Sequence, residues 1–299
     1  MLALLALSAA AAAVALAVAV ASAVRSPIRA RAASSCPALV AHRGYAYPYS
    51  TQPENSLGAF AAAFRAGAKV VKADVQFSAP SPGNPGGDAV IIHDTTVNRM
   101  TTWRGAVDRY QVGTLIRMRL LEKPGVDSSV TSQHIPTLDQ ALTAIKADRG
   151  RVMLEIHADP LTAPQAHLIA SELVKVGGWS TSPGWVSFNS FWPASLAAIR
   201  AAVAATGHTV VTQLLTWSYT PNAAGNRLED VAYAQAPASV KAGPPLTAAE
   251  VAAMHAAKVK AGAFTPDSRA EWSRLASWEV DQITTDDAGG YVAWCKARA

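Results

Sequence analysis

Short β-branched runs alternate along the chain with longer segments in which apolar residues recur every three or four positions. The first pattern is typical of buried strands and the second of amphipathic helices. The runs predict strands at Ala38–Ala41, Val70–Phe77, Ala89–His93, Arg151–Ile156, Trp185–Phe188, Thr209–Leu215, Lys258–Phe264 and Asp281–Thr285. The periodic segments predict helices at Ser56–Arg65, Leu138–Ala147, Ala163–Val176, Pro193–Ala204, Ala248–Ala257 and Arg269–Ser277.

Eight predicted strands separated by helices indicate parallel βαβ units, and eight is the number that closes a barrel. The sequence therefore predicts an α/β fold, a single-domain (β/α)8 TIM barrel. Two irregular stretches, Ser78–Gly87 and Trp217–Pro245, are long enough to be excursions from the barrel rather than turns.

The N-terminal segment differs from the rest, because Leu2–Val24 is a long, uncharged and almost entirely apolar run. Its length suits either an export signal or a membrane span. We expect residues 1–24 to be a signal peptide or signal anchor, 25–36 a linker and 37–299 the barrel. The protein is then secreted or extracytoplasmic, and only its N-terminal segment contacts a membrane.

Cys36 and Cys295 are the two cysteines of the chain, and they bracket the predicted barrel. In a closed barrel the first strand and the last helix are neighbours, so a disulfide between these cysteines is expected. It would close a very long loop, which stabilises the folded state in the chain-entropy model. It would also require an oxidising compartment, which agrees with export. The alternative is two unrelated free thiols.

The net charge is +5, but three of the positive charges (Arg25, Arg29 and Arg31) precede the predicted barrel. The barrel has no basic stripe and no interleaving of basic with aromatic residues, which argues against a nucleic acid as the partner. We expect a monomer that acts on a small molecule.

Ionisable residues recur where the predicted strands end, and in a barrel the carboxyl ends of the strands form the active face. They are His42, Arg43, Lys72, Asp74, His93, Glu155 and His157. Side chains alternate along a strand, so Lys72 shares a face with Asp74, and Glu155 shares one with His157.

These residue types point to phosphodiester chemistry. Buried carboxylates are costly unless a cation pairs with them, so Asp74 and Glu155 require a positive charge nearby. Two histidines suit acid–base catalysis because imidazole takes or gives a proton near neutral pH. The planar fork of Arg43 suits an anionic group.

The motifs in these positions resemble a known family, the glycerophosphodiester phosphodiesterases. The similar segments are His42-Arg43-Gly44, Pro53-Glu54-Asn55, Asp74-Val75, His93-Asp94, Ile135-Pro136-Thr137-Leu138, Leu154-Glu155-Ile156, Ser187-Phe188-Asn189 and Ile283-Thr284-Thr285-Asp286. The early motifs follow the family's order and approximate spacing, and the resemblance covers about residues 37–290.

The resemblance implies a TIM barrel that hydrolyses glycerophosphodiesters to an alcohol and glycerol 3-phosphate. It implies that His42 and His93 are the general acid and base and that Arg43 contacts the phosphate. Asp74 and Glu155, with Glu54 nearby, would hold a divalent cation, Mg²⁺ or Ca²⁺. Phe264 matches, more loosely, an aromatic position beside the glycerol.

The chain departs from this pattern at two places. The family's Glu-x-Asp is Lys72-Ala73-Asp74 here, and its Glu-x-Lys is Glu155-Ile156-His157. One hypothesis is that the Lys72 ammonium lies between Asp74 and Glu155, in the place of the metal, with Lys72 and His157 both contributing to the substrate site. Three outcomes stay open: metal-independent catalysis, weaker metal binding through Asp74, Glu155 and Glu54, or little hydrolase activity.

Two other functions also stay open. One is a phospholipase D-like lyase, for which Trp192, Trp217 and Tyr219 would form an apolar lip. The other is a non-catalytic protein that binds glycerophosphoryl groups.

Overall fold

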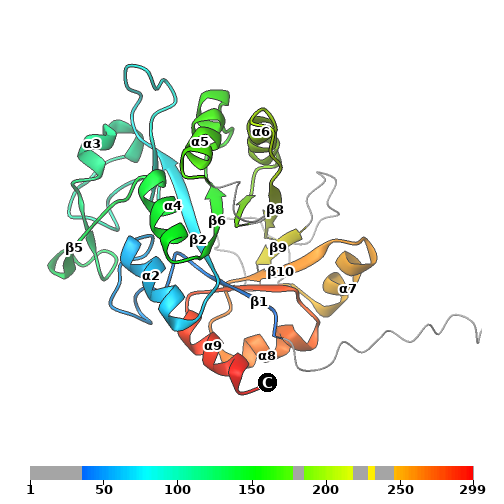
Figure 1. The fold of residues 1–299 in the computed structure, drawn as a ribbon. Helices are drawn as coiled ribbons and strands as arrows, with labels where there is room; N and C mark the ends of the chain where they lie inside the picture. Colours follow the sequence, from blue (N-terminus) through cyan, green and yellow to red (C-terminus); the bar gives the residue numbers. More distant parts are fainter. Residues whose placement is uncertain (1–35, 178–184, 218–227, 233–245, 299) are drawn as a thin grey trace, which may run out of the picture. The chain divides into compact units, whose positions relative to one another are not determined.

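The structure is a computed structural model that describes residues 36–177, 185–217, 228–232 and 246–298 (Figure 1). The segment Cys36–Arg298 forms one compact unit. Strands and helices alternate along it, as the sequence predicts, and the arrangement is that of a TIM-like α/β fold. The predicted signal segment and, apart from Cys36, the predicted linker lie outside the described residues.

Within the described residues, eight strands run parallel. They are β1 (Ala38–Ala41), β2 (Val70–Phe77), β6 (Arg151–Ile156), β7 (Val186–Ser190), β8 (Val211–Thr216), β9 (Leu228–Ala232), β10 (Lys260–Phe264) and β11 (Gln282–Thr285). Each strand from β6 to β11 pairs with the next, β6 also pairs with β2, and β11 pairs with β1. In addition, β1 pairs with β2 through Ala41 and Val71.

The prediction that Ala89–His93 is one of the parallel barrel strands was wrong. The run Ala89–His93 forms β3 (Ala89–Ile91), which lies antiparallel to β2, with Val75 opposite Ile91. The eighth parallel strand is instead β9, inside the stretch Trp217–Pro245 that the pattern predicted as an excursion. Two acidic residues interrupt the apolar run in β9, and this interruption hides the strand from a hydrophobicity pattern.

Helices lie between the parallel strands along the chain, and one more helix follows the last strand. They are α2 (Leu57–Ala66), α4 (Leu138–Ala147), α5 (Ala163–Lys175), α6 (Pro193–Ala204), α7 (Ala248–Ala256), α8 (Arg269–Ser277) and α9 (Ala288–Lys296). All but α9 match a predicted helix to within one residue at each end. Thr137 and Thr247 begin α4 and α7 with reciprocal capping boxes, as expected for those residues. The two glycines of α9, Gly289 and Gly290, lower its helix propensity, which explains why the pattern missed it.

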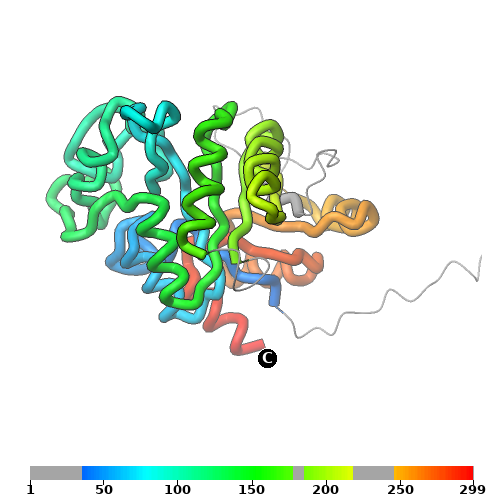
Figure 2. The backbone as a smooth tube through the Cα atoms, turned by 45° about the horizontal axis from the view of Figure 1, so that its top comes forward, coloured from blue at the N-terminus to red at the C-terminus, as the bar shows by residue number. Residues whose placement is uncertain are grey.

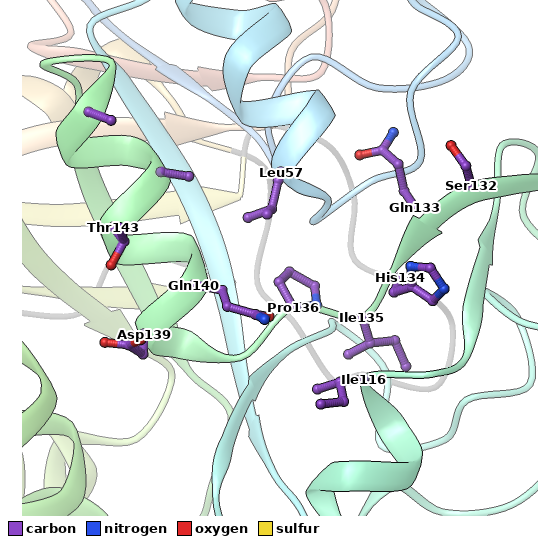
Figure 3. A pocket seen from close by; sticks show the side chains of 12 residues that line it. Leu57, Ile116, Ser132, Gln133, His134, Ile135, Pro136, Asp139, Gln140 and Thr143 are labelled. Atoms are coloured by element: carbon purple, nitrogen blue, oxygen red, sulfur yellow. The ribbon is translucent and has the colours of Figure 1, made fainter.

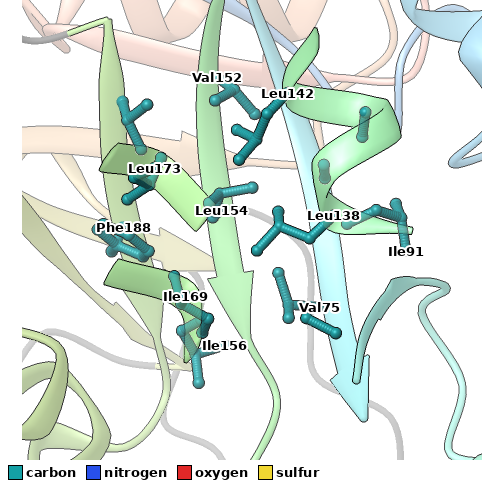
Figure 4. Packing of buried hydrophobic residues seen from close by; sticks show 14 of the residues in the cluster. Val75, Ile91, Leu138, Leu142, Val152, Leu154, Ile156, Ile169, Leu173 and Phe188 are labelled. Atoms are coloured by element: carbon teal, nitrogen blue, oxygen red, sulfur yellow. The ribbon is translucent and has the colours of Figure 1, made fainter. Parts of the chain in front are cut away.

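The outer face of the sheet packs against α4 and α5 (Figure 4). The contacting side chains are Val75, Leu154, Ile156 and Phe188 from the strands and Leu138, Leu142, Ile169 and Leu173 from the helices, all fully buried. Truncating one such leucine to alanine typically costs about 2–5 kcal/mol. Because side chains alternate along a strand, this packing directs Lys72, Asp74 and Glu155 to the opposite face.

Residues 92–137 form a lobe between β3 and α4, seen at one side of the molecule in Figure 2. The lobe contains α3 (Val112–Leu115) and the antiparallel pair β4 (Arg119–Leu121) and β5 (Val130–His134). It has its own apolar core, which includes Val97, Met100, Leu115 and Met118. The sequence pattern did not predict these elements. The shorter excursion Ser78–Gly87 connects β2 to β3.

The predicted disulfide is present. Cys36, just before β1, is bonded to Cys295 of α9, and their Cα atoms are 5.9 Å apart. The bond therefore joins the two ends of the described unit. No helix in the described part of the chain is both long and apolar enough to cross a bilayer.

Candidate active site

Several of the predicted site residues lie on the parallel strands or directly after their carboxyl ends. His42 and Arg43 follow β1, whereas Asp74 and Glu155 lie directly opposite each other on the paired strands β2 and β6. His157 follows β6. The parallel register therefore brings together residues that are about 80 positions apart in the sequence.

A buried ionic cluster forms the centre of the site. The ammonium of Lys72 pairs with Glu155 Oε2, and both side chains are at most 5% exposed. His157 Nε2 lies 3.3 Å from Asp74 Oδ1 and 3.3 Å from Glu155 Oε1. His157 Nε2 thus lies near both carboxylates, beside the pair that Lys72 forms with Glu155.

The cluster shifts the proton affinities of its members. Burial favours a raised pKa for Asp74, but the hydrogen bond from His157 and the charges of Arg43 and Lys72 hold that pKa well below its usual range. Burial favours a lowered pKa for His157, but the charges of Glu155 and Asp74 raise it above its usual value. An ionised Asp74 and a protonated His157 stabilise each other.

The same residues fit a divalent cation. One ligand atom from each of Asp74, Glu155 and His157 lies within 4.8 Å of the other two. Two carboxylates and an imidazole form a plausible donor set, provided that His157 first releases its proton. The ammonium of Lys72 beside Glu155 adds a positive charge that opposes a second cation.

Asn55 orients Asp74, a role that the sequence did not indicate beyond its place in the Pro-Glu-Asn motif. Asn55 Nδ2 donates to Asp74 Oδ2 at 2.7 Å, and Asn55 Oδ1 accepts from the backbone N–H of Asp74 at 3.2 Å. Asn55 and Arg43 both have a φ near +55°, a conformation that few residues other than glycine adopt. This unusual backbone presents both side chains to Asp74.

The two predicted acid–base histidines share one arrangement. His42 Nδ1 lies 2.7 Å from Asp286 Oδ1, and His93 Nδ1 lies 2.7 Å from Asp94 Oδ1. An ionised carboxylate can only accept a hydrogen bond, so Nδ1 carries the proton in both rings. In each histidine, Nε2 is therefore the nitrogen that can exchange a proton with a substrate.

His93 reaches the site although it does not end a parallel strand. It follows β3, and its backbone oxygen accepts a hydrogen bond from Gln76 of β2 at 3.0 Å. Its ring packs edge-on against that of His157, with centroids 4.9 Å apart. Pairing of β3 with β2 thus brings His93 to the buried cluster.

Glu54 lies between two guanidinium groups. Its carboxylate accepts hydrogen bonds from Arg43 Nη1 at 2.9 Å and from Arg99 Nη1 and Nη2 at 2.9 and 2.7 Å. Burial favours a raised pKa for Glu54, but the hydrogen bonds from Arg99 and the charge of Arg43 lower it. The structure therefore separates Glu54 from the group of possible metal ligands and pairs it with arginines instead.

Three aromatic rings border the cluster. Phe264 at the end of β10 contacts Phe191 and Trp217, which are stacked on each other with centroids 5.2 Å apart. The Lys72 ammonium lies 6.0 Å from the centre of the Phe264 ring. Of the predicted apolar lip, Trp217 belongs to this group, Trp192 is exposed, and Tyr219 lies outside the described residues.

A surface pocket of about 590 Å³ lies elsewhere, where the start of α2, the lobe and α4 meet (Figure 3). Leu57, Ile135 and Pro136 supply apolar walls, and Gln140 and His134 supply polar groups. None of the residues of the ionic cluster lines this pocket, so its chemistry is separate from the site.

Known proteins are similar to this chain over most of its length. The model of the glycerophosphoryl diester phosphodiesterase family matches residues 42–289. A Mycobacterium tuberculosis protein described as probable glycerophosphodiester phosphodiesterase 2 is 29% identical over 259 residues, covering 83% of this chain and 87% of that protein.

Two solved structures share the fold. An Oleispira antarctica phosphodiesterase, in complex with the product sn-glycerol-3-phosphate, is 20% identical with a TM-score of 0.68, covering 87% of this chain and 97% of its own. A glycerophosphodiester phosphodiesterase from Agrobacterium tumefaciens is 19% identical with a TM-score of 0.63, and the match covers 86% of this chain and 99% of that protein.

Proposed function

This chain belongs to the glycerophosphoryl diester phosphodiesterase family, and on that premise we propose that it hydrolyses glycerophosphodiesters with His42 and His93 as its acid–base pair. The products are an alcohol and glycerol 3-phosphate. Glycerol 3-phosphate is the product bound in the Oleispira antarctica relative, which supports this choice of substrate class.

The observation that carries the proposal is the matched pair of imidazoles. Each donates from Nδ1 to a carboxylate, which fixes the ring and keeps Nε2 available. One imidazole takes the proton of the water that attacks phosphorus, and the other gives a proton to the leaving alcohol. The phosphorus–oxygen bond to that alcohol then breaks. If a neighbouring hydroxyl of the substrate attacks first, a cyclic phosphate forms, and water must then open it to give glycerol 3-phosphate.

Positive charge beside the histidines would stabilise the phosphorane that forms. Arg43 is held by Glu54 at 2.9 Å and lies 3.4 Å from Asp74, which leaves it oriented to bind a phosphoryl oxygen. Lys72 is fixed by Glu155 and adds a second positive charge. Such preorganised charges are commonly the largest contribution to catalysis.

A divalent cation, Mg²⁺ or Ca²⁺ by family resemblance, would be held by Asp74, Glu155 and His157. When bound, it would supply further charge to the phosphoryl oxygens. The positive charge of Lys72 beside Glu155 supports weaker cation binding than at a site where a carboxylate takes the place of Lys72. The raised pKa of His157 supports it further, because a proton competes with the cation for the imidazole.

The eight parallel strands are proposed to close into a barrel around this site. The pairing of Ala41 with Val71 supports closure, because it connects β1, at one end of the parallel strand order, to β2, at the other end. Closure would place every carboxyl end on one rim.

An extracytoplasmic location is proposed for the enzyme. The apolar run Leu2–Val24 and the bond between Cys36 and Cys295 both support it, since disulfides persist in oxidising compartments. We expect a monomer whose N-terminal segment makes the membrane contact.

Hydrolysis of glycerophosphocholine by histidine variants tests the function. His42→Ala and His93→Ala should each lower kcat by about 10²–10⁴-fold, because each removes one proton-transfer group. His167→Ala is the matched control, since His167 is exposed on α5, and it should retain normal kcat. Normal turnover in both site variants would exclude the proposed mechanism.

A further inference from the structure

Arg99 lies between two carboxylates, each of which holds a residue of the proposed site. Its Nε and Nη2 donate to Asp94 at 2.8 and 2.9 Å, and its Nη1 and Nη2 donate to Glu54 at 2.9 and 2.7 Å. Asp94 in turn binds His93 Nδ1, and Glu54 binds Arg43 Nη1. A continuous chain of charged hydrogen bonds therefore connects His93 to Arg43.

The chain joins two separate parts of the fold. His93, Asp94 and Arg99 lie at the start of the lobe, whereas Arg43 and Glu54 lie between β1 and α2. Glu54 is 13% exposed and Asp94 is 26% exposed, so solvent weakens these bonds only in part. Through one side chain, the lobe is tied to the phosphate-binding arginine.

Only a guanidinium can make this connection. Its planar fork presents donors in several fixed directions, so it can grip two carboxylates at once and hold them at a constant separation. A lysine ammonium in its place would keep the charge but could not hold both carboxylates bidentately.

We propose that Arg99 is a positioning residue that couples the orientation of His93 to that of Arg43. The inference rests on the proposed function, in which His93 exchanges a proton and Arg43 binds the phosphate. Arg99 acts through Asp94 and Glu54 and does not itself contact the reacting atoms. Proton transfer and phosphate binding then depend on the same side chain.

Arg99→Lys should therefore lower kcat and raise KM together. Loosening Asp94 lets the His93 ring turn, and a displacement of about 1 Å at a reacting group can cost about 10²-fold in rate. Loosening Glu54 lets Arg43 shift, which weakens substrate binding. We expect a decrease in kcat of roughly 10- to 100-fold and an increase in KM of several-fold for glycerophosphocholine.

Steady-state kinetics of paired variants test the coupling. Asp94→Asn and Glu54→Gln disturb opposite ends of the chain, and their carboxylates are connected through Arg99. If Arg99 couples them, the double variant should lose less kcat/KM than the product of the two single losses. Fully additive losses of kcat/KM in folded variants would overturn the proposal. The Asp94→Asn and Glu54→Gln variants test the coupling even if Arg99→Lys fails to fold.

Arg104→Lys is the matched control, because Arg104 is an exposed arginine of the same lobe that pairs with Asp127. It should keep normal kcat and KM. Unchanged kcat and KM in a folded Arg99→Lys, with His93→Ala inactive, would overturn this inference alone. Full activity of His93→Ala would instead show that the proposed function is wrong.

Discussion

At the scale of single residues, Lys72 is one of two places where the sequence departs from the pattern of the family that it resembles. One hypothesis from the sequence was that its ammonium lies between the carboxylates of Asp74 and Glu155. In the structure Lys72 pairs with Glu155, and His157 Nε2 is the nitrogen 3.3 Å from both carboxylates. The two departures from the pattern, at positions 72 and 157, thus meet in one ionic cluster.

Lys72→Glu should convert this cluster into a stronger metal site. It removes a positive charge and adds a carboxylate, and a unit charge about 4 Å from another is worth about 4 kcal/mol at an effective dielectric of 20. About 1.4 kcal/mol of that is enough for a tenfold change in affinity. We expect at least tenfold tighter Mg²⁺ binding by calorimetry and greater loss of glycerophosphocholine hydrolysis in EDTA.

Lys69→Glu provides the control for net charge, because Lys69 is exposed just before β2. It should leave Mg²⁺ affinity unchanged. Equal Mg²⁺ affinity in Lys72→Glu and the natural protein would show that Lys72 does not oppose cation binding.

At the scale of elements, the carboxylate of Glu172 on α5 makes the stability of the protein depend on pH. Burial, together with the charge of Asp139 on α4, raises the pKa of Glu172 to about 7. In the described structure, Glu172 Oε2 is buried without a hydrogen-bond partner. The helix thus carries an acid that prefers to be protonated in the folded state.

The sign of the effect follows from proton uptake. Between about pH 4.5 and 7 the folded state binds more protons at Glu172 than the unfolded state does, so the free energy of unfolding decreases as pH rises through this window. Glu172→Gln should therefore stabilise the protein by roughly 2–3 kcal/mol at pH 8 and have little effect at pH 4.

Urea unfolding at both pH values measures this difference. The exposed Asp108 supplies the control, and Asp108→Asn should change stability equally little at pH 4 and pH 8. A Glu172→Gln protein with the same pH profile as the natural one would contradict the expected linkage.

At the scale of the whole molecule, the bond between Cys36 and Cys295 closes almost the entire described chain into one loop. The two cysteines are 259 positions apart. A loop of this length is worth about 5.6 kcal/mol in the chain-entropy model, and measured disulfides commonly contribute about 2–4 kcal/mol.

Replacing both cysteines with serine should lower the free energy of unfolding by about 2–5 kcal/mol, because the unfolded chain regains the entropy of the open loop. Denaturant unfolding measures the loss. A reducing agent should lower the stability of the natural protein and leave that of the double variant unchanged. Equal stability of the oxidised protein and the double variant would rule out this contribution.

The sequence by itself determined the alternation of strands and helices, because burial imposes a period of two on strands and about 3.6 on helices. It also pointed to candidate site residues, since strand ends carry the polar groups in this fold. The motifs around His42, Asp74 and His93 could therefore be identified before any tertiary contact was known.

Only the tertiary structure decided which strands are parallel and how the site residues pair. Two acidic residues interrupt the apolar run of β9, and its place depends on hydrogen bonds to β8 and β10. The antiparallel direction of β3 likewise depends on its pairing with β2. Glu155 pairs with Lys72 and Glu54 pairs with Arg99 from segments that are distant in sequence, and such contacts arise only when the chain is folded.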